Sequence, residues 1–589
     1  MKGDSTMITL SKEQENFIKL ALSGKNILVD ACIGSGKTTS IQQLCTKLTN
    51  KKVLYLTYNR LLKVDAKNKI KLKNVAVHNY DGFAYWRLSA TGNKIPSTSD
   101  LVMTFNRILP EIYAYDVLII DEYQDIKEEH AVMLNYIKSK NPNMQIVAVG
   151  DMKQKIYDNT TLDVEQFIEQ FLIDYEMIEF TQCFRLSKDL AETLGRIWKK
   201  PIRGVNNNCK VSHIHYSEVV SFLADKEISN ILCLGARTGD MARTLNKLES
   251  HYPDKFNKHT VYASIRDNDV VPDDKCAIFT TFDASKGLER PICVIFDFSE
   301  EYWETRISKP QTKYEILRNV FCVAASRGKY EIVFVHHNGT PLSEKTLSNH
   351  TNRHNKFDAV NMSEMFDYKF KEDIEECYQL LNIEVVRNKT DEIDIKSHDG
   401  LIDLGPCIGI YQEAIFFENY NIDEQIDLLK SIHGNRTIYV NDDWSLEKKI
   451  LAVTSFETNQ KRYIKQVKPP FITEEQKQLI KSRLSTIFKT DETVQQKCQI
   501  IFKDDVTNND FVAKGRCDVF KDNCVYELKF TSALSHEHFL QCASYIIGLN
   551  IEVGYLWNVR TDEMYRITIP NKEVFLKSVK RTITKRCYK

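Results

Sequence analysis

The residues with the clearest chemical potential form one stretch, in which an apolar run ends in a loop with two glycines, a lysine and two threonines. The stretch is Ala31-Cys-Ile-Gly34-Ser35-Gly36-Lys37-Thr38-Thr39. Glycines let backbone N–H groups surround a polyphosphate, and the following helix turns its positive dipole end toward it. Lys37 is expected to reach the β- and γ-phosphates of ATP and Thr38 to hold Mg²⁺. Ala31 stands at the first glycine of this pattern, and a tight turn without a ligand is the alternative.

Two adjacent carboxylates, Asp121 and Glu122, follow the apolar residues 117–120. Such a run is typical of a strand buried on both faces of a parallel sheet, and ligands bind at the carboxyl ends of such strands. We expect Asp121 to hold the Mg²⁺ and Glu122 to accept a proton from the water that attacks the γ-phosphate. Capping of a helix is the alternative for Asp125.

A second group of chemical residues lies in two alternating runs on either side of Asp522 and Asn523. This pair suits a two-residue hairpin turn, which would place Asp518 directly opposite Glu527. Opposed carboxylates repel each other, and Mg²⁺ or Mn²⁺ between them turns that repulsion into binding. Lys529 lies on the same face, where it can orient or activate a water. A charged surface hairpin is the alternative.

The elements around these residues alternate between helix and strand patterns. Ser11 and Gln14 form a capping box that predicts a helix over residues 11–23. Later apolar runs predict strands that end in Thr57 and Tyr58, and one that contains His78. Ligands usually bind at this edge of a parallel sheet, so an α/β fold is expected.

The bulk composition narrows the class of protein. The chain has 589 residues, 42% of them hydrophobic, and a formal net charge of +0. Nucleic acid would therefore bind through local grooves and not through a global field. Fifteen cysteines without a C-x-x-C pair fit reduced thiols. With no signal-like or membrane-spanning run, we expect a soluble intracellular protein without a membrane partner; cytoplasm and nucleus are not distinguished.

The last residues, 561–589, hold eight Lys or Arg against three Asp or Glu. This local excess of positive charge indicates either a patch that contacts a nucleic-acid backbone or a solvated tail.

Taken in order, the motifs of residues 8–338 resemble the UvrD/Rep group of superfamily 1 DNA helicases, nearest to its F-box helicase branch. The matching pieces are the phosphate loop, Asp-Glu-Tyr-Gln-Asp at 121–125, Gly-Asp-x-x-Gln-x-Ile-Tyr at 150–157, Gln-Cys-Phe-Arg at 182–185, Lys-Gly-Leu-Glu at 286–289 and Ser-Arg at 326–327. The resemblance implies two RecA-like P-loop lobes with parallel sheets.

The resemblance also implies roles for single residues. Gln14 would contact adenine, Phe184 would cover it, Gln154 would sense the γ-phosphate, and Arg185 and Arg327 would act as arginine fingers. Further residues implied at the nucleotide are Gly287 and Glu289. Residues implied at DNA are Thr57, Tyr58, His78, Tyr157 and Thr281. Tyr157 would stack on bases. Asp283 stands where relatives often have His, which puts one DNA contact in doubt.

The C-terminal pattern resembles the PD-(D/E)xK nucleases of the RecB type. The residues that carry this resemblance are Asp518, Glu527, Lys529, Gln541 and Tyr545, and of these Gln541 and Tyr545 are expected to contact DNA. Relatives add an acidic residue or histidine from an earlier helix, for which Glu413 is the candidate third metal ligand. The iron-sulfur cysteines of some relatives are absent. A nuclease fold without activity is the alternative.

The expected organisation is a first motor lobe at 1–175, a second lobe at 176–338, a linker or helical connector at 339–397 and an α/β restriction-endonuclease-like domain at 398–589. The expected function is ATP-dependent translocation or unwinding of DNA, 3′ to 5′, coupled to a metal-dependent nuclease, as in DNA repair or recombination. Single- and double-stranded DNA are the expected partners; protein partners are unknown. The alternatives are a C-terminal domain that only binds DNA or a partner, and an ATP-driven switch without translocation.

Overall fold

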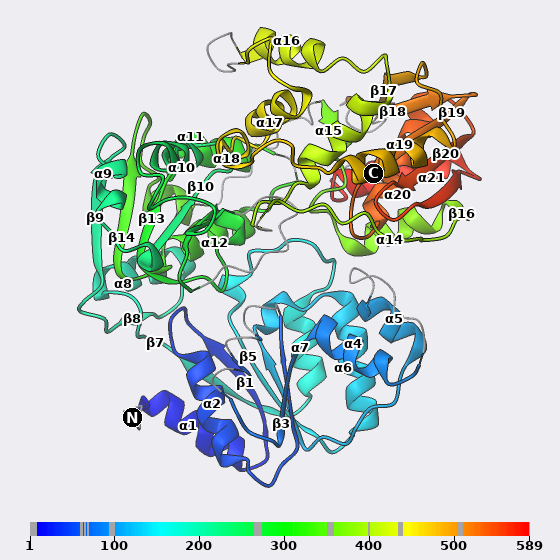
Figure 1. Ribbon diagram of the computed structural model, residues 1–589. Coiled ribbons are helices and arrows are strands. Elements are labelled where there is room, and N and C mark those ends of the chain that lie inside the picture. Colours follow the sequence, from blue (N-terminus) through cyan, green and yellow to red (C-terminus); the bar gives the residue numbers. More distant parts are fainter. Residues whose placement is uncertain are drawn as a thin grey trace.

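The computed structural model describes residues 9–58, 63, 66–67, 70–92, 101–263, 274–309, 311–349, 359–398, 401–433, 440–503 and 510–587. Within these residues, two six-stranded sheets and one seven-stranded sheet organise the chain (Figure 1). No helix among them is long and apolar enough to cross a membrane.

The first lobe is a parallel sheet with the strand order β3-β2-β4-β5-β1-β6. Its strands are β1 (Asn26–Ala31), β2 (Val53–Thr57), β3 (Val75–Asn79), β4 (Val117–Asp121), β5 (Gln145–Gly150) and β6 (Tyr175–Phe180). Every residue of β2 and β4 is buried, because helices cover both faces of the sheet.

The helices of this lobe divide between the two faces. They are α1 (Lys12–Leu22), α2 (Lys37–Lys47), α4 (Tyr80–Ser89), α5 (Leu101–Ile108), α6 (Glu128–Lys140) and α7 (Val164–Leu172). Helices α1 and α2 pack into one apolar core, and the other four pack into a second one. The predicted capping box begins α1, which confirms the helix expected there.

The second lobe repeats this architecture with the strand order β11-β12-β10-β13-β14-β9, again all parallel. Its strands are β9 (Lys210–His215), β10 (Ile231–Gly235), β11 (Val261–Ala263), β12 (Ala277–Thr281), β13 (Arg290–Ile295) and β14 (Gly328–His336). Its helices are α8 (Lys188–Trp198), α9 (Val219–Ala224), α10 (Asp240–His251), α11 (Glu300–Ile307), α12 (Tyr314–Ala324) and α13 (Glu344–Ser348). The expected α/β architecture with parallel sheets is confirmed for both lobes.

The two lobes share apolar contacts. Cys32 and Ile33, from the loop after β1, belong to the same core cluster as Leu234 and Phe321 of the second lobe. The loop that was expected to bind phosphate therefore lies at the boundary between the lobes.

The C-terminal domain is a mixed sheet with the order β15-β18-β19-β20-β21-β16, with β17 paired to β18. Its strands are β15 (Val360–Asn361), β16 (Asn382–Arg387), β17 (Thr493–Phe502), β18 (Phe511–Lys521), β19 (Cys524–Lys529), β20 (Val553–Asn558) and β21 (Glu563–Thr568). Its helices are α14 (Lys371–Gln379), α15 (Gly405–Phe416), α16 (Ile422–His433), α17 (Leu446–Glu457), α18 (Arg462–Gln466), α19 (Glu474–Ser485), α20 (His536–Gly548) and α21 (Lys572–Ile583). A hairpin, β18–β19, is followed by α20 and by β20, which pairs in parallel with β19.

Two of the expected domain boundaries require correction. Strand β6 pairs with β1 along its whole length, so the first lobe extends to Phe180 and not to residue 175. The segment expected as a connector, 339–397, contributes β15 and β16 to the C-terminal sheet. Two strands of this segment pair within the C-terminal sheet, and the apolar face of α14 packs in the C-terminal core. The C-terminal domain therefore begins near residue 360.

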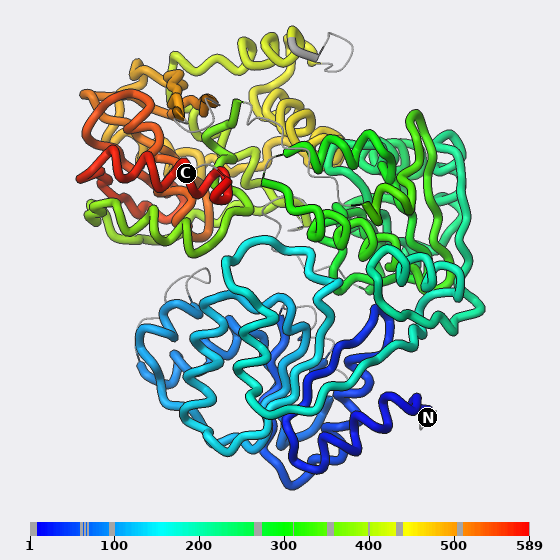
Figure 2. The backbone as a smooth tube through the Cα atoms, turned by 180° about the vertical axis from the view of Figure 1, so that it is seen from behind, coloured from blue at the N-terminus to red at the C-terminus, as the bar shows by residue number. Residues whose placement is uncertain are grey.

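The C-terminal domain touches both motor lobes (Figure 2). On the second lobe, Nη2 of Arg462 lies 2.6 Å from Oε1 of Glu249, and both side chains are buried. On the first lobe, the backbone N–H of Lys371 donates to the carbonyl of Asn159 at 3.2 Å. The domain therefore forms a bridge across the motor.

Candidate functional sites

The phosphate loop joins β1 to α2 as the sequence pattern predicted. Gly34 and Gly36 have φ angles of 67° and 78°, in the left-handed region that favours glycine. A Cβ at Gly34 would lie 2.7 Å from Cβ of Arg185, and one at Gly36 would lie 2.8 Å from Nε2 of Gln14. Ala31 is the buried last residue of β1, a position in which a side chain fits. Alanine at position 31, in place of the first glycine of the phosphate-loop pattern, therefore leaves the turn unchanged.

Lys37 is held by the acidic pair at the end of β4. Its Nζ lies 3.3 Å from Oε1 of Glu122. Burial would raise the pKa of Glu122, but the charges of Lys37 and Lys286 lower it to about 2. The carboxylate of Glu122 is therefore ionised, as a proton acceptor must be.

Asp121 has the surroundings of a cation ligand. The hydroxyl of Tyr55 donates to its Oδ2 at 2.7 Å, whereas Oδ1 is buried without a partner. Burial and the charge of Glu122 raise the pKa of Asp121 to about 7. A divalent cation would satisfy the orphaned oxygen and relieve this repulsion. Thr38 and Thr39, in the first turn of α2, supply hydroxyl oxygens beside the loop. These groups fit Mg²⁺.

The two glutamines expected at the nucleotide are both buried and already hydrogen-bonded. Gln14 accepts from the backbone N–H of Ser11 at 2.9 Å and donates through Nε2 to the carbonyl of Ser35 at 3.0 Å. Its capping role is confirmed, while its contact with adenine stays a prediction. Gln154 donates to Oδ2 of Asp151 at 2.8 Å. Through its bond to Ser35, Gln14 stabilises the phosphate loop.

The second lobe contributes a cluster of charged side chains to the expected nucleotide site. Arg185 forms an ion pair with Glu289, whose Oε1 also lies 2.7 Å from Nζ of Lys329. Arg327 donates through Nε to the carbonyl of Val323 at 2.9 Å, but its Nη2 is buried without a partner. Burial and the nearby charge of Arg185 lower the pKa of Arg327. An anion would stabilise this guanidinium, which fits the phosphates of ATP.

Phe184 and Gly287 complete the expected nucleotide set. The backbone N–H of Phe184 donates to the carbonyl of Gly34 at 2.9 Å, and its ring is 40% exposed. The ring is therefore free to cover a base next to the loop. Gly287 has a φ of 80°, which turns the chain directly after Lys286.

Two lysines that sequence reasoning missed connect the lobes. Nζ of Lys286 lies 2.5 Å from Oδ2 of Asp125 and donates to the carbonyl of Gln154 at 2.9 Å. Nζ of Lys200, just after α8, lies 2.6 Å from Asp30. Lys286 belongs to the Lys-Gly-Leu-Glu motif, which was a usable signal, whereas no motif marks Lys200.

Three of the residues expected at DNA in the first lobe lie in two aromatic pairs. The rings of Tyr58 and Tyr157 stack with centroids 5.6 Å apart. The ring of His78 stacks on Trp86 at 5.0 Å, and burial with the charge of Lys63 lowers the pKa of His78 to about 4. Thr57 is buried, and its hydroxyl has no partner. Stacking of Tyr157 on a base stays a prediction.

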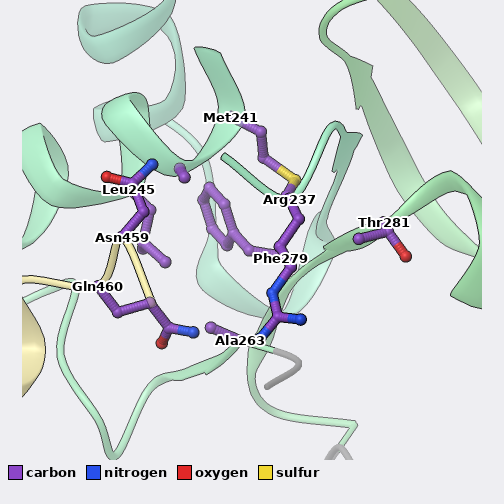
Figure 3. Close-up of a pocket in the computed structure, with 9 residues that line it drawn as sticks. Arg237, Met241, Leu245, Ala263, Phe279, Thr281, Asn459 and Gln460 are labelled. Carbon is purple, nitrogen blue, oxygen red and sulfur yellow. The ribbon is translucent and has the colours of Figure 1, made fainter. Parts of the chain in front are cut away.

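Thr281 is the last residue of β12, in the second lobe. It lines a pocket between the second lobe and the C-terminal domain, together with Arg237, Phe279, Asn459 and Gln460 (Figure 3). The next residue, Phe282, belongs to the apolar cluster against which Tyr157 packs. A contact of Thr281 with DNA stays a prediction.

The hairpin of the C-terminal domain has the predicted register. Val519 pairs with Tyr526 and Lys521 with Cys524. Asp522 and Asn523 have φ angles of 49° and 58°, as a two-residue turn with two left-handed residues requires. The expected register is therefore confirmed from Lys521–Cys524 to Val519–Tyr526, and the opposition of Asp518 to Glu527 stays a prediction.

Lys529 joins the residues of the nuclease-like pattern. Its Nζ donates to Oε1 of Glu527 at 2.8 Å and to Oε1 of Gln541 at 2.9 Å. Gln541 donates in turn to the hydroxyl of Tyr545 at 2.9 Å. Burial would lower the pKa of Lys529, but Glu527 and Asp518 raise it. The lysine is thus a cation held in a continuous hydrogen-bonded chain.

Three carboxylates influence one another around this lysine. Burial and the charge of Glu527 raise the pKa of Glu413, on α15, to about 8, although Gln495 donates to it at 2.7 Å. Burial and the charges of Glu527 and Glu413 also raise the pKa of Asp518, whose Oδ2 accepts from the backbone N–H of Leu528 at 2.7 Å. Sequence reasoning had chosen Glu413 on its place before the hairpin.

One oxygen of this group is unsatisfied. Oε2 of Glu527 is buried and has no hydrogen-bond partner in the part of the chain that the structure describes. Among the described residues, no three or more His, Cys, Asp or Glu side chains form a closed metal-ligating cluster. The carboxylate oxygens of Asp518, Glu527 and Glu413 are the ligand type that a hard divalent cation prefers. A cation among them would bind the unsatisfied oxygen and relieve the repulsion between the carboxylates.

Comparisons with known proteins concern mainly the motor. Residues 14–160 match the AAA domain family. An ATP-dependent helicase/nuclease protein of Staphylococcus aureus (strain JH9) is 29% identical over 139 residues, and its counterpart in strain N315 gives the same values. These residues are 22% of this chain and 11% of the relative, so the chain matches only a small part of these proteins. Both findings support a superfamily 1 helicase-like ATPase.

Solved helicases were also found among similar structures. Dbp5 of S. cerevisiae, bound to RNA and ADP BeF3, is 13% identical and has a TM-score of 0.35, covering 56% of this chain and 84% of that chain. The helicase nonstructural protein 10 of an arterivirus is 12% identical and has a TM-score of 0.28, covering 54% of this chain and 61% of that chain.

Proposed function

We propose that this chain is an ATP-dependent DNA translocase or helicase, moving 3′ to 5′, with a metal-dependent nuclease as its C-terminal domain. One observation carries the motor assignment: the buried Nη2 of Arg327, on the second lobe, has no partner among the described residues, at a nucleotide site built mainly on the first lobe. A guanidinium in this state is suited to the charge of a transferring phosphoryl group.

Each residue of the nucleotide site has a separate role in ATP hydrolysis. Thr38 and Asp121 would hold Mg²⁺, which neutralises charge on the β- and γ-phosphates. Lys37 and Arg327 bind the phosphates from opposite lobes. Glu122, ionised beside Lys37, accepts the proton of the attacking water. Because the arginine and the acid belong to different lobes, hydrolysis depends on how the lobes are closed.

ATP hydrolysis with and without single-stranded DNA tests this proposal. Lys37→Ala and Arg327→Ala should each abolish most DNA-stimulated hydrolysis, and the loss for Arg327 should approach about 10³-fold. Lys19→Ala is the matched control, because Lys19 is an exposed lysine of α1. Hydrolysis by Lys37→Ala at the wild-type rate would refute the assignment. Replacing DNA by RNA of the same sequence tests the choice of nucleic acid.

The nuclease proposal rests on the unsatisfied oxygen of Glu527. Asp518, Glu527 and Glu413 would hold Mg²⁺ or Mn²⁺, which would polarise the phosphodiester and lower the pKa of a bound water. Lys529 stands beside Glu527 as a fixed cation, placed to orient that water and to stabilise negative charge on the phosphate.

Cleavage without ATP is the clean test of the nuclease. Wild type, Asp518→Asn and Lys529→Ala are incubated with end-labelled single- and double-stranded DNA and Mg²⁺ or Mn²⁺. Both variants should lose cleavage, while Lys514→Ala, at an exposed position of β18, should keep it. Equal cleavage by wild type and Lys529→Ala would identify another nuclease as its source.

A C-terminal domain that only binds DNA or a partner is the second candidate. This candidate is favoured by the hydrogen bonds that Lys529 makes to Glu527 and Gln541, because they neutralise and orient these side chains without any metal ion. No cleavage by the wild type on any end structure, with or without ATP, would establish this second candidate.

A further inference from the structure

Three parts of the chain meet around one aspartate of the first lobe. Nζ of Lys313, just before α12 of the second lobe, lies 2.8 Å from Oδ1 of Asp158. Nζ of Lys585, just after α21, lies 3.1 Å from Oδ2 of Asp158 and donates to its backbone carbonyl at 2.6 Å. Asp158 follows Tyr157, the expected base-stacking residue, so this meeting point adjoins the expected path of the strand.

A fourth charged residue at this point has no counter-charge. Lys369 is only 9% exposed, and among the described residues it makes no hydrogen bond or ion pair. Burial, with the like charges of Lys585 and Lys309, lowers the pKa of Lys369 to about 8. The ammonium group itself reaches solvent and lies near the like charges of Lys585 and Lys309, so it is open to an anion.

We call Lys309, Lys313, Lys369 and Lys585, with Asp158, the junction cluster. It combines four lysines with one aspartate, of which only Lys313 and Lys585 contact that aspartate.

An exposed tyrosine directly precedes Lys369 in the chain. Tyr368 is 78% exposed and has a φ of 57°, so the chain turns sharply at this residue. Phe370 is buried on the other side of Lys369, with Nζ of Lys313 and of Lys585 each 5.2 Å from its ring centre. Phe370 and its cation–π contacts with Lys313, Lys585 and Arg586 thus hold the segment that presents Tyr368 to solvent.

Unneutralised ammonium groups beside an exposed aromatic ring are the elements of single-strand recognition, in which cations follow the backbone and rings stack on bases. The segment after Lys369 also contacts the first lobe, since the backbone N–H of Lys371, the first residue of α14, donates to the carbonyl of Asn159. The cluster is therefore fixed relative to the motor.

We propose that Lys369 binds a phosphodiester of a single nucleic-acid strand and that Tyr368 stacks on one of its bases, where the strand passes from the motor to the C-terminal domain. This site rests on the proposed function, because it requires a chain that binds single strands. It differs from the expected motor contacts in lying on the C-terminal domain.

The salt dependence of binding tests the phosphate contact. A fluorescein-labelled oligothymidylate long enough to extend beyond the motor is titrated with the full-length protein at several salt concentrations, followed by anisotropy. One phosphate contact on a single strand contributes about 0.7 to the slope of log K against log [salt]. Lys369→Gln should reduce the slope by about this amount, whereas Lys369→Arg should retain it.

The matched control is Lys577→Gln, which removes an equal charge from an exposed position of α21. Its slope should equal that of the wild type. A reduction equal to that of Lys369→Gln would show a general field effect and would overturn the site.

The aromatic contact is tested on its own. Tyr368→Ala should weaken binding of the long strand by about 10-fold, while Tyr368→Phe should restore it, because stacking needs the ring and not the hydroxyl. On a strand too short to extend beyond the motor, Tyr368→Ala and wild type should bind equally. An equal loss on the short strand would overturn the placement.

Thermal unfolding separates binding from folding. Since Lys369 has no ion-pair partner among the described residues, Lys369→Gln should have a Tm close to that of the wild type. A lower Tm would show that Lys369 has a structural partner, which would overturn the site. Wild-type slopes for Lys369→Gln would overturn this site alone, whereas failure of the wild type to bind any single strand would overturn the proposed function with it.

Discussion

Nζ of Lys286, on the second lobe, lies 2.5 Å from Oδ2 of Asp125 on the first lobe, and both side chains are buried. The same ammonium group lies 3.8 Å from Oε2 of Glu122. One lysine therefore ties the acidic end of β4 to the opposite lobe, beside the residue proposed to activate water. This contact makes the nucleotide site depend on lobe closure.

We expect Lys286→Met to destabilise the protein strongly, because it leaves Asp125 buried without its counter-charge. Removing one partner of a buried ion pair typically costs about 3–5 kcal/mol. The double variant Lys286→Met/Asp125→Leu should recover most of this loss, since both charges are then gone. Denaturant unfolding of the two single variants and the double variant measures the coupling. Additive effects of the two changes would refute the pairing.

The defect of Lys286→Met should also depend on pH. Burial raises the pKa of Asp125 to about 6 although Lys286 lowers it, so the loss of Lys286 should raise this pKa further. A carboxyl group whose pKa is higher in the folded state binds protons on folding, and its protonation stabilises that state. The deficit relative to wild type should therefore shrink as the pH falls from about 7 to 5. A deficit that grows over this range would contradict the buried carboxylate.

The contact between Arg462 and Glu249 should determine whether the C-terminal domain stays docked on the second lobe. Arg462→Met leaves a buried Glu249 without its partner at 2.6 Å, at an expected cost of about 3–5 kcal/mol. Hydrogen exchange should accelerate in α10 and α18. Lys461→Met, at the exposed neighbouring position, is the control and should exchange like the wild type. Unchanged exchange in Arg462→Met would show that other contacts suffice.

Tyr157 distinguishes a translocase from a nucleotide switch. If its ring stacks on bases, Tyr157→Ala should displace less streptavidin from biotinylated single strands for each ATP hydrolysed, and Tyr157→Phe should restore this ratio. The ring of Tyr58, stacked 5.6 Å away, is expected to support this position. A wild-type protein that hydrolyses ATP without displacing streptavidin from either end would instead be a switch.

Metal binding at the C-terminal site can be measured without nucleotide. Asp518→Asn removes an anionic ligand with little change of shape, so Mn²⁺ affinity in a calorimetric titration should fall by at least about 10-fold. Asp522→Asn is the matched control, because this exposed turn residue undergoes the same change four positions away and Asn tolerates its φ of 49°. Equal affinities for Asp518→Asn and wild type would exclude Asp518 as a ligand.

Patterns of neighbouring residues were sufficient to predict many local elements of this protein. The glycines and lysine of residues 34–37 predicted a strand, a phosphate loop and a helix, and the structure has β1 and α2 there. The turn at Asp522 and Asn523 predicted the pairing of β18 with β19 next to the turn, from Lys521–Cys524 to Val519–Tyr526. These predictions succeed because turn geometry and side-chain alternation are properties of a few consecutive residues.

Contacts between distant parts were decided only by the tertiary structure. Polar composition favoured a connector at 339–397, yet β16 pairs with β21, far along the chain, and completes the C-terminal sheet. Lys286 was placed in a motif, but its partner Asp125 belongs to the other lobe. Lys369 has no motif, and its lack of a counter-charge is visible only in the folded chain. Pairing and burial of such residues depend on which surfaces meet after the chain closes, and no local pattern encodes that.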